Sequence, residues 1–255
     1  MSIIAIWGPP NSGKTTLAVD LAFALAGNGS SVCLISPEPY SELGAMLEQS
    51  IRPEHSLTAA QKNAGPPERI AVRVGDGLFL LAAASDADAF AEDLGGDSAR
   101  NVLERAAEAF DAVLVDCPAA TDNAVSAWAL QLSESVLILS GCRSASALWF
   151  SAYRRVIGTL GAKGIPVCLE AGGSFHYKGL LQMINMTPAV WVPYIKESVK
   201  SRLIFKPTGE LHTSKQDFPV VILNGRDVFN ENLPGTRWVG TYQVVILLFQ
   251  VVTVI

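Results

Sequence analysis

Residues 3–16 read IIAIWGPPNSGKTT, a short apolar run followed at once by a loop rich in glycine and proline. The loop from Gly8 to Thr16 fits the spacing G-x-x-x-x-G-K-[ST]. The apolar run Ile3–Trp7 predicts a buried strand, and leucines repeating every four residues predict a helix over residues 14–26. In this order, the backbone N–H groups of the loop lie at a helix N-terminus and form a nest for anions.

Each part of this loop has a physical role in holding a polyphosphate. Gly8 and Gly13 permit backbone angles and a close approach that a side chain would block. Lys14 is expected to neutralise charge on the β- and γ-phosphates, and the hydroxyl of Thr15 is expected to ligate Mg²⁺. A chance match is disfavoured by the strand before the loop and the helix after it. The predicted nucleotide-binding residues are therefore Gly8, Pro9, Pro10, Asn11, Ser12, Gly13, Lys14, Thr15 and Thr16.

A second feature is the apolar run 112–115, which ends in Asp116. In proteins with such a loop, a carboxylate at the end of a buried strand faces the magnesium ion through water. Alone, Asp116 would read as an ordinary strand-end residue, but beside the loop it is expected to hold the metal together with Thr15. Asp122 follows six residues later and is expected to be the N-cap of the next helix.

Strand-like and helix-like segments alternate through the first 205 residues. Alternation of this kind produces parallel strands with crossover helices, so the predicted fold class is α/β, a three-layer sandwich around a mostly parallel twisted sheet. The expected strands cover 3–7, 32–35, 70–74, 78–83, 112–115, 136–139, 167–169 and 189–192. The expected helices cover 14–26, 40–49, 99–110, 122–131, 145–160, 178–184 and 195–203, and 50–68 is expected to be loop-rich.

The amino-acid composition limits the classes to which this protein can belong. The chain has 255 residues, a net charge of −5, 49% apolar residues and 17% charged residues. This content excludes disorder as the main state, and the acidic balance argues against a protein that coats nucleic acid. The start of the chain has no basic segment before its apolar run, which predicts a cytoplasmic protein.

Cysteine and histidine spacing argues against a metal centre other than magnesium. The four cysteines are far apart and form no CxxC pair, and each lies in or beside an apolar run. They are expected to be buried reduced thiols. The three histidines are scattered, whereas a zinc site needs clustered ligands.

Three motifs together resemble the ParA/MinD-type branch of P-loop ATPases, of the SIMIBI class. They are the loop, Val-Asp-Cys-Pro at 115–118 and Val-Pro-Tyr at 192–194. Within this branch, the chain is most similar to TadZ/CpaE-like members and to ParA-like proteins of Firmicutes. The resemblance covers roughly residues 1–210 and implies the P-loop NTPase fold for an ATPase domain over 1–213, with ATP and Mg²⁺ as cofactors.

The resemblance also implies catalytic residues, with departures from the family pattern. Lys14, Asp116 and Glu38 are the implied set, and Glu38 stands where the family has a second Asp that positions the attacking water. Glutamate can do this work but reaches one methylene further; the other interpretation of Glu38 is a solvated loop carboxylate. Pro9 stands where the family has a lysine that reaches the partner's phosphates in a dimer. The Asn that often reads adenine has no counterpart in Leu-Glu-Ala at 169–171.

These features predict a Mg²⁺-ATP-binding, slowly hydrolysing switch ATPase that positions or assembles a cellular machine. The resemblance suggests a Tad-type pilus or secretion apparatus, or partitioning. A non-hydrolysing nucleotide-binding interaction module is one alternative, and a small-molecule kinase or ligase on the same fold is another. The partners implied are a second copy in a homodimer, pilus, secretion or partitioning proteins, and, more weakly, nonspecific DNA. The cations for DNA would be Arg154, Arg155, Lys196, Lys200, Arg202 and Lys206.

Beyond this domain, residues 214–255 form a strand-rich apolar tail. The stretch 239–255 carries no charge, is short for a membrane span and is interrupted by two glutamines. No membrane span is therefore expected. Three interpretations stay open: a buried or edge strand pair, a membrane contact, and a non-native end.

Overall fold

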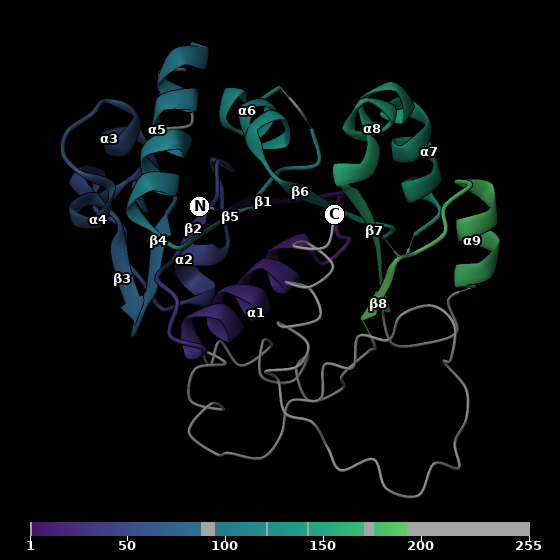
Figure 1. Cartoon of the computed structure of the whole chain (residues 1–255), viewed down its shortest axis with the longest axis horizontal. Coiled ribbons are helices and arrows are strands. Elements are labelled where there is room, and N and C mark those ends of the chain that lie inside the picture. The colour runs from purple at the N-terminus through teal and green to yellow at the C-terminus, as the bar shows by residue number, and fades with distance from the viewer. Residues whose placement is uncertain (1, 88–94, 121, 142, 171–175, 193–255) are drawn as a thin grey trace, which may run out of the picture.

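The computed structural model describes residues 2–87, 95–120, 122–141, 143–170 and 176–192. Within them the chain forms a sheet of eight strands with helices packed on both faces (Figure 1). Seven of the strands are linked by parallel pairings. The predicted α/β class and the three-layer arrangement are confirmed.

The elements follow one another in the order expected of repeated strand–helix units. The strands are β1 (Ser2–Trp7), β2 (Val32–Ile35), β3 (Val72–Gly75), β4 (Leu78–Leu81), β5 (Ala112–Asp116), β6 (Ser135–Leu139), β7 (Gly164–Leu169) and β8 (Val190–Val192). The helices are α1 (Lys14–Gly27), α2 (Leu43–Met46), α3 (Leu57–Gln61), α4 (Pro67–Ile70), α5 (Gly95–Ala109), α6 (Ala124–Leu132), α7 (Ala145–Ala152), α8 (Arg154–Leu160) and α9 (Tyr177–Met183). Two 3₁₀ turns, η1 (Pro53–His55) and η2 (Gly161–Lys163), complete the list.

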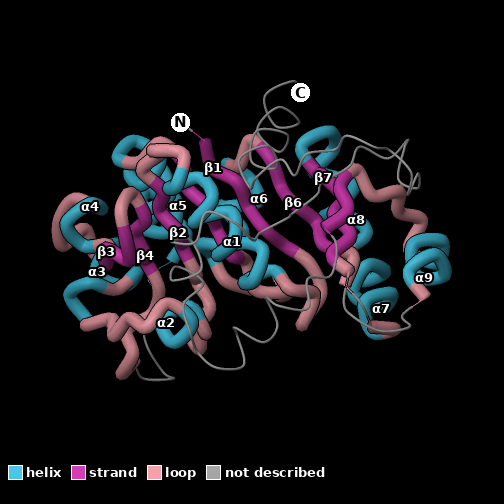
Figure 2. The backbone as a smooth tube through the Cα atoms, turned by 90° about the horizontal axis from the view of Figure 1, so that it is seen from below, coloured by secondary structure: helices cyan, strands magenta, loops and turns pink. Residues whose placement is uncertain are grey.

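The sheet places β1 among its central strands. Its strand order is β3-β4-β2-β5-β1-β6-β7-β8, and only β3 runs antiparallel to its neighbour. Figure 2 shows α1 crossing the middle of the sheet on one side. From β1 the chain crosses to β2, which lies on the β5 side of β1. From β5 the chain crosses in the opposite direction, past β1, to β6. This change of direction makes the end of β1 a topological switch point.

Strand β1 explains why both faces of the sheet are buried. Successive side chains of a strand point to opposite faces. Ile3, Ala5 and Trp7 enter one apolar core with residues of α3, α5, α6, α7 and α8. Ile4 and Ile6 enter a second core with α1 and the segment around α2. An unbroken apolar strand therefore requires helices on both sides, as Figure 1 shows.

Two expected helices differ from the structure. The helix expected over 145–160 is divided into α7 and α8 at Tyr153, whose backbone leaves helical geometry while its ring packs edge-on against Trp7 at 5.1 Å between centroids. The helix expected over 40–49 is reduced to the four residues of α2, and Glu48 then takes a positive φ of 52°. The loop-rich stretch 50–68 also holds the short helix α3 and the start of α4.

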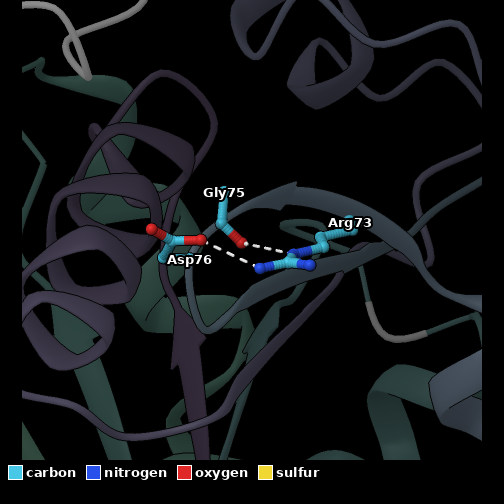
Figure 3. Close-up of polar contacts among 3 residues, drawn as sticks. All are labelled: Arg73, Gly75 and Asp76. Atoms are coloured by element: carbon cyan, nitrogen blue, oxygen red, sulfur yellow. Dashed lines mark hydrogen bonds and ion pairs between the residues drawn. The ribbon is translucent and has the colours of Figure 1, made fainter.

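Strands β3 and β4 form a hairpin with a tight turn at Asp76 and Gly77. Figure 3 shows the Arg73 guanidinium donating to the carbonyl of Gly75 at 3.3 Å and to Asp76 Oδ1 at 2.9 Å. Both side chains of this ion pair are exposed, so it contributes little to stability. Gly77 has φ of +72°, and a Cβ there would lie 2.8 Å from the carbonyl oxygen of Ser30. The turn therefore requires glycine at this position.

Several expectations fall on parts of the chain outside the described residues. They are the last expected helix over 195–203, the apolar tail 214–255, and Cys142. Cys33, Cys117 and Cys168 are buried thiols, as expected. The division into a domain over 1–213 and a tail stays a prediction.

Gly77→Ala is expected to lower the free energy of unfolding by about 1–3 kcal/mol, because alanine at this φ is strained and its methyl group meets backbone. Gly158→Ala is the matched control, since Gly158 lies inside α8 with open space around it. There alanine should raise stability by about 0.5–1 kcal/mol. Urea unfolding measures both, and equal effects of the two substitutions would contradict the role given to the turn.

Candidate functional site

The predicted site residues lie at the carboxyl ends of the parallel strands β1, β2 and β5: in the loop after β1 and the start of α1, in the loop after β2, and at the end of β5. Ligands of open α/β sheets bind outside these strand ends, at a topological switch point. The loop after β1 lies at such a point. The loops after β2 and β5 supply Glu38 and the residues that follow Asp116.

The loop after β1 exposes the N-terminus of α1. Gly13 is its N-cap, with φ of 88°, and no side chain caps the helix. The first turn contains no acidic residue. Asn11 also has a positive φ of 56°, which sequence reasoning did not assign, although asparagine tolerates this region. A loop that alternates left-handed positions before a helix directs successive N–H groups toward one point, which suits an anion.

Close packing against β6 fixes the start of this loop. A Cβ at Gly8 would lie 2.9 Å from the carbonyl oxygen of Leu139, so a side chain cannot fit there. Pro9 is buried, and a Cβ built on Gly141 would lie 3.3 Å from its ring. The residue at position 9 therefore faces the protein.

Lys14 bends back across the loop. Its Nζ donates to the carbonyl oxygen of Pro9 at 3.0 Å. Partial burial lowers the pKa of Lys14, against the opposing effect of the nearby carboxylates of Asp116 and Glu38. The Lys14 ammonium is thus held close to the loop amides. Its hydrogen-bond partner, the carbonyl oxygen of Pro9, is neutral, so an anion can replace it.

Asp116 is the most buried charged side chain of the site, with 6% of its surface exposed. Burial raises its pKa to about 6, and the negative charges of Glu38 and Glu42 act in the same direction. A hydrogen bond with the Thr15 side chain and the charge of Lys14 act in the opposite direction. The carboxylate therefore sits where its negative charge is poorly compensated.

Three buried oxygen atoms of the site have no hydrogen-bond partner among the described residues. They are Asp116 Oδ1, Ser12 Oγ and Ser36 Oγ. Buried polar atoms normally have partners, so their presence at one sheet edge points to a ligand. Carboxylate and hydroxyl oxygens are the donors that Mg²⁺ prefers. In the described part of the chain, no group of three or more His, Cys, Asp or Glu could hold a metal ion.

Glu38 is brought to the same place by the loop after β2. It is partly buried and acts on the charges of both Lys14 and Asp116. Glu38 thus lies close enough to Lys14 and Asp116 to act on their charges, although the three residues lie far apart in sequence. Glu42 was missed by sequence reasoning, because it belongs to no motif.

The prediction for Asp122 is wrong, because Asn123 is the N-cap of α6. Asn123 Oδ1 accepts a hydrogen bond from the Ser126 N–H at 3.2 Å, and Asp122 is exposed. The backbone is still extended at Asn123, so α6 begins at Ala124. The N-cap position therefore falls on Asn123 and not on Asp122.

An aromatic cluster behind the site was also missed. Trp7, which is fully buried, packs edge-on against Trp149 at 4.6 Å between centroids. Tyr153 joins both rings. The Trp149 indole N–H donates to the carbonyl of Ala119 at 2.8 Å. Helix α7 therefore contacts the strand before the phosphate loop and also the loop after Asp116.

Comparison with protein families identifies the chain. Residues 1–149, more than half of the chain and including all the site residues above, match the family described as cellulose biosynthesis protein BcsQ. The chain belongs to this family. A search of curated proteins gives no match to it.

Solved structures show the fold of this BcsQ-family chain in distant relatives. MinD in a MinC:MinD cell division complex of Aquifex aeolicus superposes with a TM-score of 0.64 at 20% identity, over 84% of this chain and 89% of that one. A ParA-family ATPase of Chlorobium tepidum superposes with a TM-score of 0.67 at 13% identity, over 85% and 95%. MinD of Pyrococcus horikoshii, solved with Mg-ADP, gives 0.64 at 16%, over 84% and 90%. The ParA/MinD-type resemblance is confirmed, and the TadZ/CpaE-like subtype stays a prediction.

None of the helices in the described ranges is both long and apolar enough to cross a bilayer.

Lys14→Ala is expected to weaken binding of Mg²⁺-ATP by at least about 100-fold, because a polyphosphate at the loop would lose its central cation. Titration calorimetry on the folded protein measures the affinity. Arg73→Ala is the control, since it removes a cation from the exposed hairpin and should leave binding unchanged. Equal affinities of the wild type and Lys14→Ala would contradict the assignment.

Asp116→Asn is expected to stabilise the metal-free protein at neutral pH by about 1–3 kcal/mol. The folded-state pKa of Asp116 is raised to about 6. Its protonated form therefore favours folding below about pH 4, and this contribution is lost as the pH rises through 6. The difference between the wild type and Asp116→Asn should be small at pH 4 and large at pH 7.5. Urea unfolding with a chelator measures it, and a difference independent of pH would contradict the burial of a charge.

Proposed function

We propose that this protein is a Mg²⁺-ATP-dependent switch that hydrolyses ATP slowly. The observation that carries the proposal is the buried Asp116 carboxylate, which shares a hydrogen bond with Thr15 and faces the charge of Lys14. These residues adjoin a helix N-terminus that no side chain caps. A polyphosphate and a magnesium ion together would supply the charges that each of these groups lacks.

The chain's own groups divide the work of binding and hydrolysis. The amides of the loop and Lys14 hold the phosphates, and Lys14 gives up its bond to the Pro9 carbonyl to do so. Thr15 and Asp116 hold the magnesium ion, which when bound neutralises phosphate charge. Glu38, partly buried beside them, accepts a hydrogen bond from the attacking water and orients it.

The same charges give a reason for switching. Without a cation, the negative charges of Glu38 and Glu42 raise the pKa of Asp116 and disfavour its charged form. Binding of a divalent cation would remove this repulsion and draw the loop after β2 toward the site. Loss of the γ-phosphate would reverse the change.

The residue at position 9 gives the reason for expecting slow hydrolysis of ATP. Related P-loop ATPases resembled by this chain carry a lysine there, whereas Pro9 is buried against Gly141. No cation from this position can reach phosphate on the same chain or on a partner. We propose that hydrolysis relies on Lys14 alone and that any dimer forms without a lysine exchanged between sites.

The family name favours one setting for the switch. A family described as cellulose biosynthesis protein BcsQ points to positioning or assembly of a polysaccharide-producing machine. The fold is shared with MinD and ParA-family proteins. A Tad-type apparatus stays a prediction, as does DNA binding; Arg154 and Arg155 are exposed on α8, and the other cations considered for DNA lie outside the described residues.

Glu38→Gln is expected to lower the turnover of ATP by about 10–100-fold, because an amide does not orient water as a carboxylate does. Its ATP affinity should stay within about threefold of the wild type, since Lys14 and the loop amides remain. Phosphate release under saturating Mg²⁺-ATP measures the rate, and calorimetry measures affinity.

Three results would contradict parts of this proposal. Tight ATP binding with no turnover in the wild type would identify a non-hydrolysing module. Turnover unchanged in Glu38→Gln would remove Glu38 from the reaction. Turnover that rises strongly with one small-molecule acceptor would identify a kinase or ligase.

A further inference from the structure

The amide of Asn123 makes two hydrogen bonds that join separate loops. Its Oδ1 accepts from the Ser126 N–H at 3.2 Å and caps α6. Its Nδ2 donates to the carbonyl oxygen of Pro37 at 3.3 Å, across 86 residues of sequence. One side chain therefore ties the loop after β5 to the loop after β2.

The Pro37 carbonyl controls the position of Glu38. The carbonyl of Pro37 and the N–H of Glu38 belong to one rigid peptide plane. Pro39 follows Glu38 and restricts it to extended conformations. Pro37 itself is buried. A bond that holds the Pro37 oxygen therefore fixes the direction in which the Glu38 backbone leaves the sheet.

The other end of the bond is attached to a firm part of the fold. Helix α6 contributes Val125 and Ala129 to the core. Lys163 donates to the carbonyls of Leu130 and Gln131 at its C-terminal end, at 2.6 and 2.9 Å. Asn123 thus anchors the loop that carries Glu38 to α6, a helix whose two ends are each held by side-chain hydrogen bonds.

Asparagine combines two properties that this position uses. Asn, Asp and Ser cap helices about equally well, but among them only Asn adds N–H donors beside the capping oxygen and reaches a second loop without a charge. Aspartate here would add a carboxylate beside the loop that carries Glu38 and would offer no donor to Pro37.

We infer that Asn123 is a positioning residue that clips the Glu38 loop to α6 and so couples the two loops that contact the nucleotide. This inference rests on the proposed role of Glu38 in hydrolysis. The clip keeps Glu38 facing Lys14 and Asp116 despite the repulsion between the carboxylates. It acts on the rate of hydrolysis rather than on the affinity for ATP, because the two hydrogen bonds of the Asn123 side chain go to Pro37 and Ser126 and not to the loop 8–16.

The test uses Asn123→Ser and Asn123→Asp, which keep a capping oxygen and lose the donor to Pro37. Both should keep the melting temperature within a few degrees of the wild type. The kcat for ATP should fall about 5–20-fold, with KM and ATP affinity within about threefold. Ser56→Ala is the matched control: it removes the cap of α3, whose hydroxyl bonds to Pro53 and Ala59 in its own segment, and should lower stability while leaving kcat unchanged. Wild-type kcat in both Asn123 variants would overturn the inference.

A second arm separates this inference from the proposed function. In a Glu38→Gln background, Asn123→Ser should cause no further loss of kcat, because both act through one group. Hydrogen exchange with Mg²⁺-ADP bound gives a readout that needs no turnover. The amides of Glu38 and Tyr40 should exchange faster in Asn123→Ser than in the wild type. Faster exchange in a protein that shows no hydrolysis would support the clip and reject the catalytic role of Glu38, while equal exchange would reject the clip.

Discussion

Opposite charges held away from water at one edge of the sheet are the constraint on which the site depends. Burial raises the pKa of Asp116 and lowers that of Lys14, so each group is displaced toward its neutral form. Glu38 adds a further negative charge to the same place. Folding tolerates this cost because the sheet buries apolar residues on both faces, and a polyanion bound with a divalent cation would relieve it.

The surrounding contacts explain how a change at this edge can spread. Gly8 packs on the end of β6, and Trp149 from α7 holds the carbonyl of Ala119. Asn123 holds the carbonyl of Pro37. The start of the loop after β1 thus packs on the end of β6, and the loop after β5 is hydrogen-bonded through side chains to α7 and to the loop after β2. A nucleotide that moved the loop after β5 would therefore act on the loop after β2 and on helix α7, which carries the exposed Leu148.

The parts of the structure that sequence predicted are those set by local patterns. Strands such as β1, β2 and β5 are continuous apolar runs, which need burial wherever they occur, and the loop 8–16 carries its own glycines and lysine. The proximity of Glu38 to Lys14 followed from a family resemblance and not from spacing. The missed features depend on contacts between distant residues. Tyr153 breaks a helix because Trp7 lies beside it, and Asn123 rather than Asp122 caps α6 where a bond to Pro37 is within reach.

Binding of a polyphosphate by the loop 8–16 is tested most directly by a crystal structure of the protein with Mg²⁺ and a non-hydrolysable ATP analogue. The expected result has the β- and γ-phosphates against the amides of residues 10–16, with Lys14 Nζ moved from the Pro9 carbonyl to phosphate oxygen. Asp116 should then lie in the surroundings of the metal ion. An analogue bound elsewhere, or a loop that keeps the Lys14–Pro9 bond with no phosphate against its amides, would contradict the assignment of this site.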